Sequence, residues 1–69
     1  MYSILIRILN CKSARWKYLT NSDGSIYVED DLLKVQDKVN ELIKDYLLKD
    51  IQVVKNYIIH EDVTIEEVI

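Results

Sequence analysis

The first nine residues form a mostly apolar run of the kind that is typical of a buried β-strand. Residues 2–9 read YSILIRIL, a run of β-branched and long aliphatic side chains that is too short for a helix. Alternation places the three isoleucines on one face, and the opposite face carries Leu5, Arg7 and Leu9. Because both faces are largely apolar, the pattern predicts a strand at the centre of a sheet.

Two further strands are predicted at residues 14–20 and 25–29, joined by a turn at residues 21–24. Gly24 can adopt the positive φ that a short hairpin loop requires. Side chains in residues 14–20 alternate between two faces. We expect one face to pack on a helix, and it carries Ala14, Trp16 and Tyr18. The other face carries Arg15, Lys17 and Leu19. In residues 25–29 we expect Ile26 and Val28 to point inward and Tyr27 outward.

A helix is predicted after the acidic cluster at residues 29–31, which supplies an N-cap and negative charge at the helix start. The apolar positions that follow recur at helical spacing and span one buried face. They are Leu32, Val35, Val39, Leu42, Ile43, Tyr46 and Leu47.

The last third of the chain predicts a fourth strand and a tail whose structure is ambiguous. Residues 51–60 are rich in β-branched side chains that alternate between two faces. In the tail, Thr64 to Glu67 fits a capping box for a short helix, whereas residues 63–65 also fit a last strand after a turn at Glu61 and Asp62. We favour a short helical or irregular tail.

These elements predict a single α+β domain over residues 1–69, with the order βββαβ. A right-handed crossover through the helix would place the fourth strand parallel to the first, which gives a mixed four-stranded sheet of order 3-2-1-4. One helix covers only one face of such a sheet. The other face would expose an apolar set, through which we expect self-association to a dimer or a higher oligomer, unless the tail covers it. That set is Leu5, Leu9, Leu19 and Tyr27.

Charge is distributed unevenly along the chain. The first 22 residues hold four cations and no carboxylate, whereas the rest holds all twelve carboxylates against five lysines, which gives +4 followed by −7 and a net charge of −3. Arg7, Arg15 and Lys17 form a candidate anion-binding group on the uncovered face, and the RWKY segment interleaves these cations with aromatic residues. The acidic net charge disfavours nucleic acid as a partner.

Catalytic and metal-binding patterns are not evident in the sequence. Cys11 and His60 could pair as thiolate and imidazole, but no residue is placed to orient them. The acidic clusters at 29–31 and 61–62 lack the spacing of a calcium loop, and helix capping and a solvated turn explain them better. We therefore expect no enzyme activity, no cofactor and no metal.

The sequence thus predicts a small non-catalytic interaction or assembly module with an unidentified protein partner or a second copy of itself. Two alternatives remain: an accessory protein that binds nucleic acid through the basic hairpin, and a small phage-type inhibitor of a host protein. Because no stretch approaches the length of a membrane span and the apolar start lacks a signal-peptide pattern, we expect a cytoplasmic protein without membrane contact.

Overall fold

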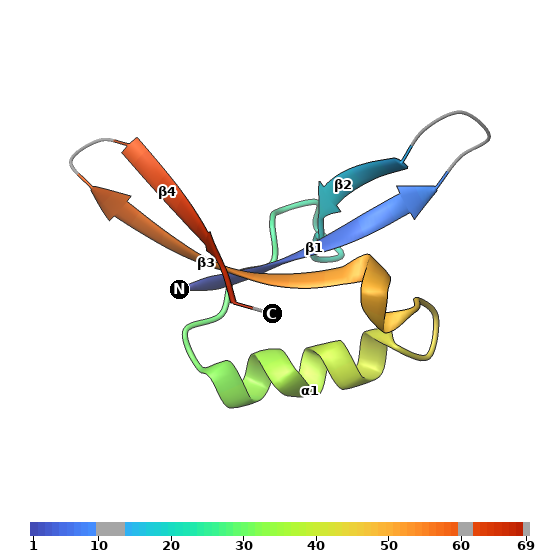
Figure 1. The fold of residues 1–69 in the computed structure, drawn as a ribbon. Coiled ribbons are helices and arrows are strands. Elements are labelled where there is room, and N and C mark those ends of the chain that lie inside the picture. Colours follow the sequence, from blue (N-terminus) through green and yellow to red (C-terminus); the bar gives the residue numbers. More distant parts are fainter. Residues whose placement is uncertain (10–13, 60–61, 69) are drawn as a thin grey trace.

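The computed structural model describes residues 1–9, 14–59 and 62–68, and this part of the chain forms an α+β domain (Figure 1). Its elements are β1 (Tyr2–Leu9), β2 (Ala14–Tyr18), α1 (Leu32–Leu42), the 3-10 turn η1 (Leu48–Asp50), β3 (Ile51–Ile59) and β4 (Asp62–Glu67). The predicted fold class, with four strands and one helix, is confirmed.

The four strands form one sheet of order β2-β1-β3-β4 in which every pair of neighbours is antiparallel. β1 lies between β2 and β3, so the central position predicted from its two apolar faces is correct. Ile4 lies opposite Val53 in β3, and Leu5 lies opposite Tyr18 in β2. The splayed hairpins β1–β2 and β3–β4 rise from the sheet on the side away from α1 (Figure 1).

The predicted mixed sheet of order 3-2-1-4 is wrong, because residues 25–29 do not form a strand of the sheet. They make only isolated bridges, from Ile26 to Thr20 and from Glu29 to Tyr2. At Glu29 the chain already runs antiparallel to β1, so α1 returns along the direction of β1 and β3 then runs opposite to it (Figure 1). Because we counted residues 25–29 as a strand of the sheet, we predicted that the strand after the helix runs parallel to β1. In the structure that strand, β3, runs antiparallel to β1.

Residues 62–67 form a strand, not the short helical or irregular tail that we favoured. β4 pairs with β3 from Asp62 opposite Ile59 to Glu67 opposite Val54. The free edge of β3 explains this outcome, because it offers a ladder of backbone hydrogen bonds that a helical tail would leave unused.

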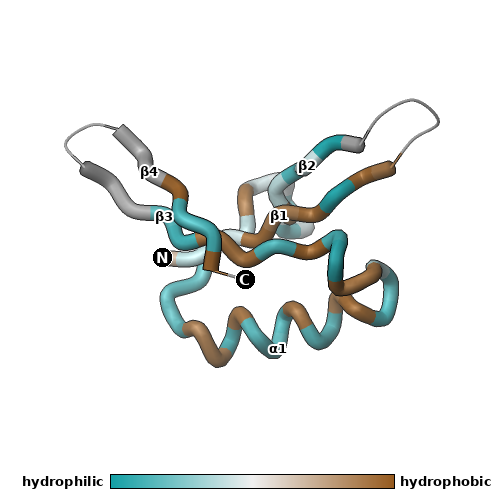
Figure 2. The backbone as a smooth tube through the Cα atoms, viewed as in Figure 1, coloured by the Kyte–Doolittle hydropathy of each residue, from teal (hydrophilic) through white to brown (hydrophobic). Residues whose placement is uncertain are grey.

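The core lies between α1 and one face of the sheet. Val35, Val39 and Leu42 are the buried positions of α1, and they pack on buried residues of β1 and β3, namely Ile4, Ile6, Ile51 and Val53. Figure 2 shows hydrophobic positions recurring along α1 between hydrophilic ones. The helix ends at Leu42, earlier than predicted, and the apolar residues beyond its end, Ile43, Tyr46 and Leu47, are exposed.

Side chains in the two loops fix the start of the helix and the hairpin turn. Asp31 is the N-cap of α1, where its carboxylate accepts a hydrogen bond from the backbone N–H of Leu33 at 3.0 Å. In the preceding turn the Asp23 carboxylate accepts hydrogen bonds from the backbone N–H and the hydroxyl of Ser25. Gly24 has φ +89°, as the predicted turn requires.

Candidate interaction face

The sheet face opposite α1, which we call the open face, has no helix across it in the described part of the chain. The two hairpins rise on either side of it (Figure 1). Strand register places the following side chains on it: Ser3, Leu5, Arg7, Leu9, Trp16, Tyr18, Gln52, Val54, Asn56, Ile65 and Glu67.

Large apolar side chains remain exposed on the open face. Leu9 is 63% exposed, Trp16 46% and Ile65 48%. They come from three different strands, β1, β2 and β4, and Leu5 and Tyr18 lie half-buried on the same face. Exposed apolar side chains on one face are typical of a surface that binds another protein.

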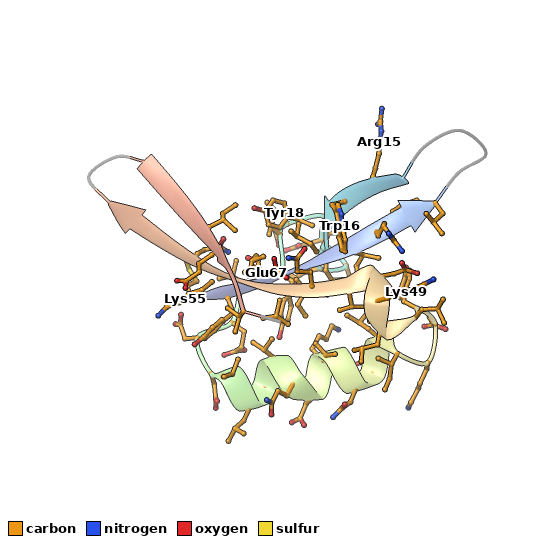
Figure 3. All side chains as sticks on the ribbon, in the orientation of Figure 1. Arg15, Trp16, Tyr18, Lys49, Lys55 and Glu67 are labelled. Atoms are coloured by element: carbon orange, nitrogen blue, oxygen red, sulfur yellow. The ribbon has the colours of Figure 1, made fainter. Side chains whose placement is uncertain are left out.

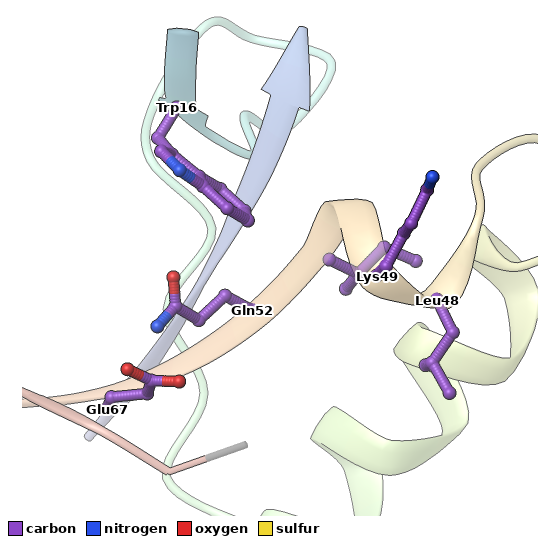
Figure 4. A pocket seen from close by; sticks show the side chains of 6 residues that line it. Trp16, Leu48, Lys49, Gln52 and Glu67 are labelled. Atoms are coloured by element: carbon purple, nitrogen blue, oxygen red, sulfur yellow. The ribbon is translucent and has the colours of Figure 1, made fainter. Parts of the chain in front are cut away.

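A pocket of about 340 Å³ opens on this side of the sheet. Figure 4 shows the Trp16 indole and the Glu67 carboxylate, from the two edge strands, with the Gln52 amide between them. Leu48, Lys49 and Ile51 complete the lining. The pocket therefore combines an aromatic surface with a carboxylate, an amide and an ammonium group, which suits hydrogen bonding to a polar partner and provides no nucleophile paired with a base.

Arg7 and Asp50 form an ion pair beside the Trp16 ring. The guanidinium donates hydrogen bonds to one carboxylate oxygen of Asp50, at 2.8 Å from Nε and 2.6 Å from an Nη atom. The guanidinium carbon lies 5.9 Å from the centre of the Trp16 ring. Because Asp50 is buried and neutralises Arg7, this pair holds η1 against β1 and leaves little net charge at the centre of the open face.

Half of the predicted self-association residues lie on the open face. Leu5 and Leu9 are there, but Leu19 and Tyr27 pack against the core on the helix side. The backbone N–H of Leu19 donates to the Ile4 carbonyl, so Leu19 continues the pairing of β2 with β1 and lies opposite Ile4. The Leu19 side chain therefore lies on the same side of the sheet as Ile4, which is the helix side. The predicted sides of this strand were therefore reversed: Trp16 and Tyr18 face the open side, where they lie opposite Arg7 and Leu5.

The predicted anion-binding residues do not converge. Arg7 lies on the open face, paired with Asp50, whereas Arg15 and Lys17 lie on the other side of the pleat, opposite Ile8 and Ile6. In Figure 3 the Arg15 and Trp16 side chains extend from β2 in opposite directions. Alternation alone could not show which set faces the helix, because that depends on how β2 pairs with β1.

A second pocket, of about 220 Å³, lies at the start of β1. Ser3 is buried there, and its hydroxyl accepts a hydrogen bond from the Asn56 amide. Ile26 and Val28, which we expected to point inward, are 48% and 43% exposed and line this pocket. Tyr27, between them, turns toward the core instead, so the inward and outward positions of residues 25–29 are the reverse of the prediction.

The other candidate chemistry has little support in the described residues. Cys11, His60 and Glu61 lie outside them. Within residues 1–9, 14–59 and 62–68, no group of three or more His, Cys, Asp or Glu residues is arranged to hold a metal ion. No helix in the same ranges is long and apolar enough to cross a membrane.

Comparison with known proteins adds no family to this picture, since no protein-family model, no curated protein and no solved structure matches the chain.

Proposed function

We propose that this chain is a small, non-catalytic interaction module that self-associates through its open face. The observation that carries the proposal is the exposure of Leu9, Trp16 and Ile65 on the side of the sheet that α1 does not cover. Leu9 and Trp16 belong to the consecutive strands β1 and β2, whereas Ile65 belongs to β4 far along the chain, and the fold places all three on one face. The ion pair of Arg7 with Asp50 lowers the cost of removing that face from water.

Simple energetics favour a weak, concentration-dependent association. Burying the exposed part of each of these three side chains contributes about 1 kcal/mol, which gives roughly 6 kcal/mol from two copies. Bringing two molecules together costs about 4–15 kcal/mol in lost translational and rotational freedom. The apolar contribution is therefore close to the lower end of that cost, and we expect a reversible dimer rather than an obligate one.

The shape of the face supports a second copy as its partner. The hairpins β1–β2 and β3–β4 splay apart on the side away from α1 (Figure 1). A second copy that packs face to face on this side would bury Leu9, which is exposed at the end of β1. Such an arrangement is isologous, because each copy contributes the same face.

The alternatives from the sequence receive less support. Binding of nucleic acid through the basic hairpin needs cations on one face, and Arg7 lies on the opposite side of the pleat from Arg15 and Lys17. A small inhibitor of a host protein would use the same open face, and a monomer in solution would favour that alternative. A cytoplasmic location is also part of the proposal, supported by a single cysteine, Cys11, which permits no intrachain disulfide.

Sedimentation equilibrium of a matched pair of variants tests the open face. Leu9→Asn removes an apolar side chain from that face, whereas Ile8→Asn makes the same kind of change at the neighbouring residue, which is 44% exposed on the other side of β1. We expect the average mass of the unmodified chain to rise with concentration. Leu9→Asn should weaken the association several-fold, and Ile8→Asn should leave it nearly unchanged.

A chain that stays monomeric up to about 1 mM, where even a weak complex would form, would overturn the proposal. Equal weakening by both variants would also contradict it, because Ile8 does not lie on the open face.

A further inference from the structure

The two edge strands of the sheet carry charges of opposite sign. β2 and β4 are the outer strands. Arg15 and Lys17 are exposed on β2, and Glu66 and Glu67 are exposed on β4. Among the described residues, none of these four side chains takes part in an ion pair. Each edge therefore displays charge that no ion pair between described residues neutralises, although Glu66 lies opposite Lys55 of β3.

The outer edge of β2 also offers free backbone groups. The hydrogen bond from the Leu19 N–H to the Ile4 carbonyl, at 2.8 Å, marks that pair as hydrogen-bonded. Hydrogen-bonded and non-hydrogen-bonded residue pairs alternate along an antiparallel ladder. The backbone groups of Lys17 therefore form hydrogen bonds with β1. Those of Trp16 and Tyr18 point outward, away from β1. No backbone hydrogen bond between the described residues occupies those outward groups.

The outer edge of β4 has the same property. The Val68 N–H donates to the Val53 carbonyl at 2.8 Å, so the next bonded pair is Glu66 with Lys55. Ile65 and Glu67 consequently turn their backbone N–H and C=O groups away from β3. In the described part of the chain these groups also lack a backbone partner.

We propose that copies of this chain join edge to edge, with β2 of one copy pairing with β4 of the next. The direction of the strands permits this, because β4 runs along β1 while β2 runs against it. Two copies placed side by side in the same orientation would therefore bring β2 and β4 together as an antiparallel pair. This inference goes beyond the proposed function, since it uses the edges of the sheet instead of the open face.

One register satisfies the hydrogen bonds, the faces and the charges together. It sets Trp16 opposite Glu67 and Tyr18 opposite Ile65 of the next copy, all with outward backbone groups and all on the open face. Between them, Lys17 lies opposite Glu66 as a non-bonded pair, in which side chains approach closely. Both of these side chains lie on the helix side of the pleat.

Opposite charge also selects against the other edge pairings. Two β2 edges would bring cations together, and two β4 edges would bring carboxylates together, and each is unfavourable across a strand pair. Only the β2–β4 pairing is favourable. Such a contact joins two different surfaces, so it does not close on itself as a twofold dimer does and produces rings or open chains of copies.

Charge exchange at Lys17 and Glu66 tests the pairing. We expect Lys17→Glu and Glu66→Lys each to weaken the association of edges about fivefold or more, as measured by sedimentation velocity. The doubly exchanged chain should associate as the unmodified chain does. An equimolar mixture of the two single variants should also associate, because each variant's β2 then meets a β4 of opposite charge. Lys34→Glu, an exposed change of the same sign on α1, should have no effect.

Circular dichroism of each variant confirms that it is folded, and restoration in the mixture excludes loss of the fold as the cause. Single variants that associate as the unmodified chain does would overturn the edge pairing, as would failure of both the double variant and the mixture to restore it. The open-face proposal is tested separately, because Leu9→Asn alters the open face and leaves Lys17 and Glu66 in place.

Discussion

Arg7 is the side chain that most clearly links the sheet to the segment before β3. Its guanidinium lies between the buried Asp50 carboxylate of η1 and the Trp16 ring of β2. A hydrogen bond to a charged partner contributes more than a neutral one, and the loss of one partner leaves the other charge without compensation in a partly buried place. The ion pair is therefore expected to matter for stability as well as for the character of the open face.

Asp50→Ala should lower the free energy of unfolding by about 1–3 kcal/mol, because it leaves the half-buried Arg7 without its carboxylate. Urea denaturation measures this change. Glu41→Ala is the control, since Glu41 pairs with Lys38 at 3.8 Å on the exposed side of α1 and should change stability by less than about 0.5 kcal/mol. Equal effects of the two variants would contradict the role given to Asp50.

Tyr27 makes the stability of the domain depend on pH in the alkaline range. Burial against the core, and then the negative charge of Glu29, raises the pKa of the Tyr27 hydroxyl above its ordinary value. The folded state therefore holds this proton more tightly than the unfolded state. Its contribution is fully present below the pKa of an unfolded tyrosine, about 10, and is lost as the pH rises through the folded value.

Tyr27→Phe should accordingly reduce the loss of stability that the chain shows above about pH 10, the pKa of an unfolded tyrosine. Urea denaturation at a series of alkaline pH values compares the two proteins. The same pH dependence in both would show that Tyr27 does not contribute.

At the scale of the elements, helix α1 depends on its first residues. Asp31→Ala removes the side chain that caps the Leu33 N–H and should cost about 1 kcal/mol of stability. Asp30→Ala is a matched control, because the neighbouring Asp30 side chain is 89% exposed and does not cap the helix. Thermal unfolding followed by circular dichroism measures both, and a larger effect at Asp30 would contradict the assigned cap.

The turn before the helix depends on one backbone conformation. A Cβ added to Gly24 would meet no atom within 4 Å, but its φ of +89° is strained for any residue with a side chain. Gly24→Ala should therefore lower stability by about 1–2 kcal/mol through the backbone alone. Ser22→Ala in the same turn should have little effect, and urea denaturation distinguishes the two variants.

The elements that could be predicted from the sequence are those with a strong local signal. β1, the start of α1 and the strand beginning at Ile51 were predicted correctly, because each has a clear apolar period or a capping residue. Residues 25–29 and the tail were not. The alternation at Ile26 and Val28 resembles a strand, yet the chain there makes only single bridges, and the tail became β4 because β3 had a free edge.

At the scale of the whole molecule, the errors concern relations between distant segments. The parallel crossover was wrong because one strand was miscounted, and the sides of β2 were reversed because its register with β1 is a tertiary property. The idea of an uncovered apolar face depends only on one helix and one sheet, so that feature is present, although two of the four residues assigned to it pack against the core on the helix side. Trp16, on the edge strand β2, is an exposed aromatic residue of this face.

The emission of this tryptophan tests the central claim most directly, because Trp16 is the only tryptophan in the chain and lies on the open face, 46% exposed. The fluorescence maximum should be recorded from about 1 µM to about 1 mM, the range in which a weak complex forms. Self-association through the open face predicts a shift to shorter wavelength as the concentration rises, in step with the mass from sedimentation and absent from Leu9→Asn. A maximum that stays constant while the sedimenting mass increases would contradict it.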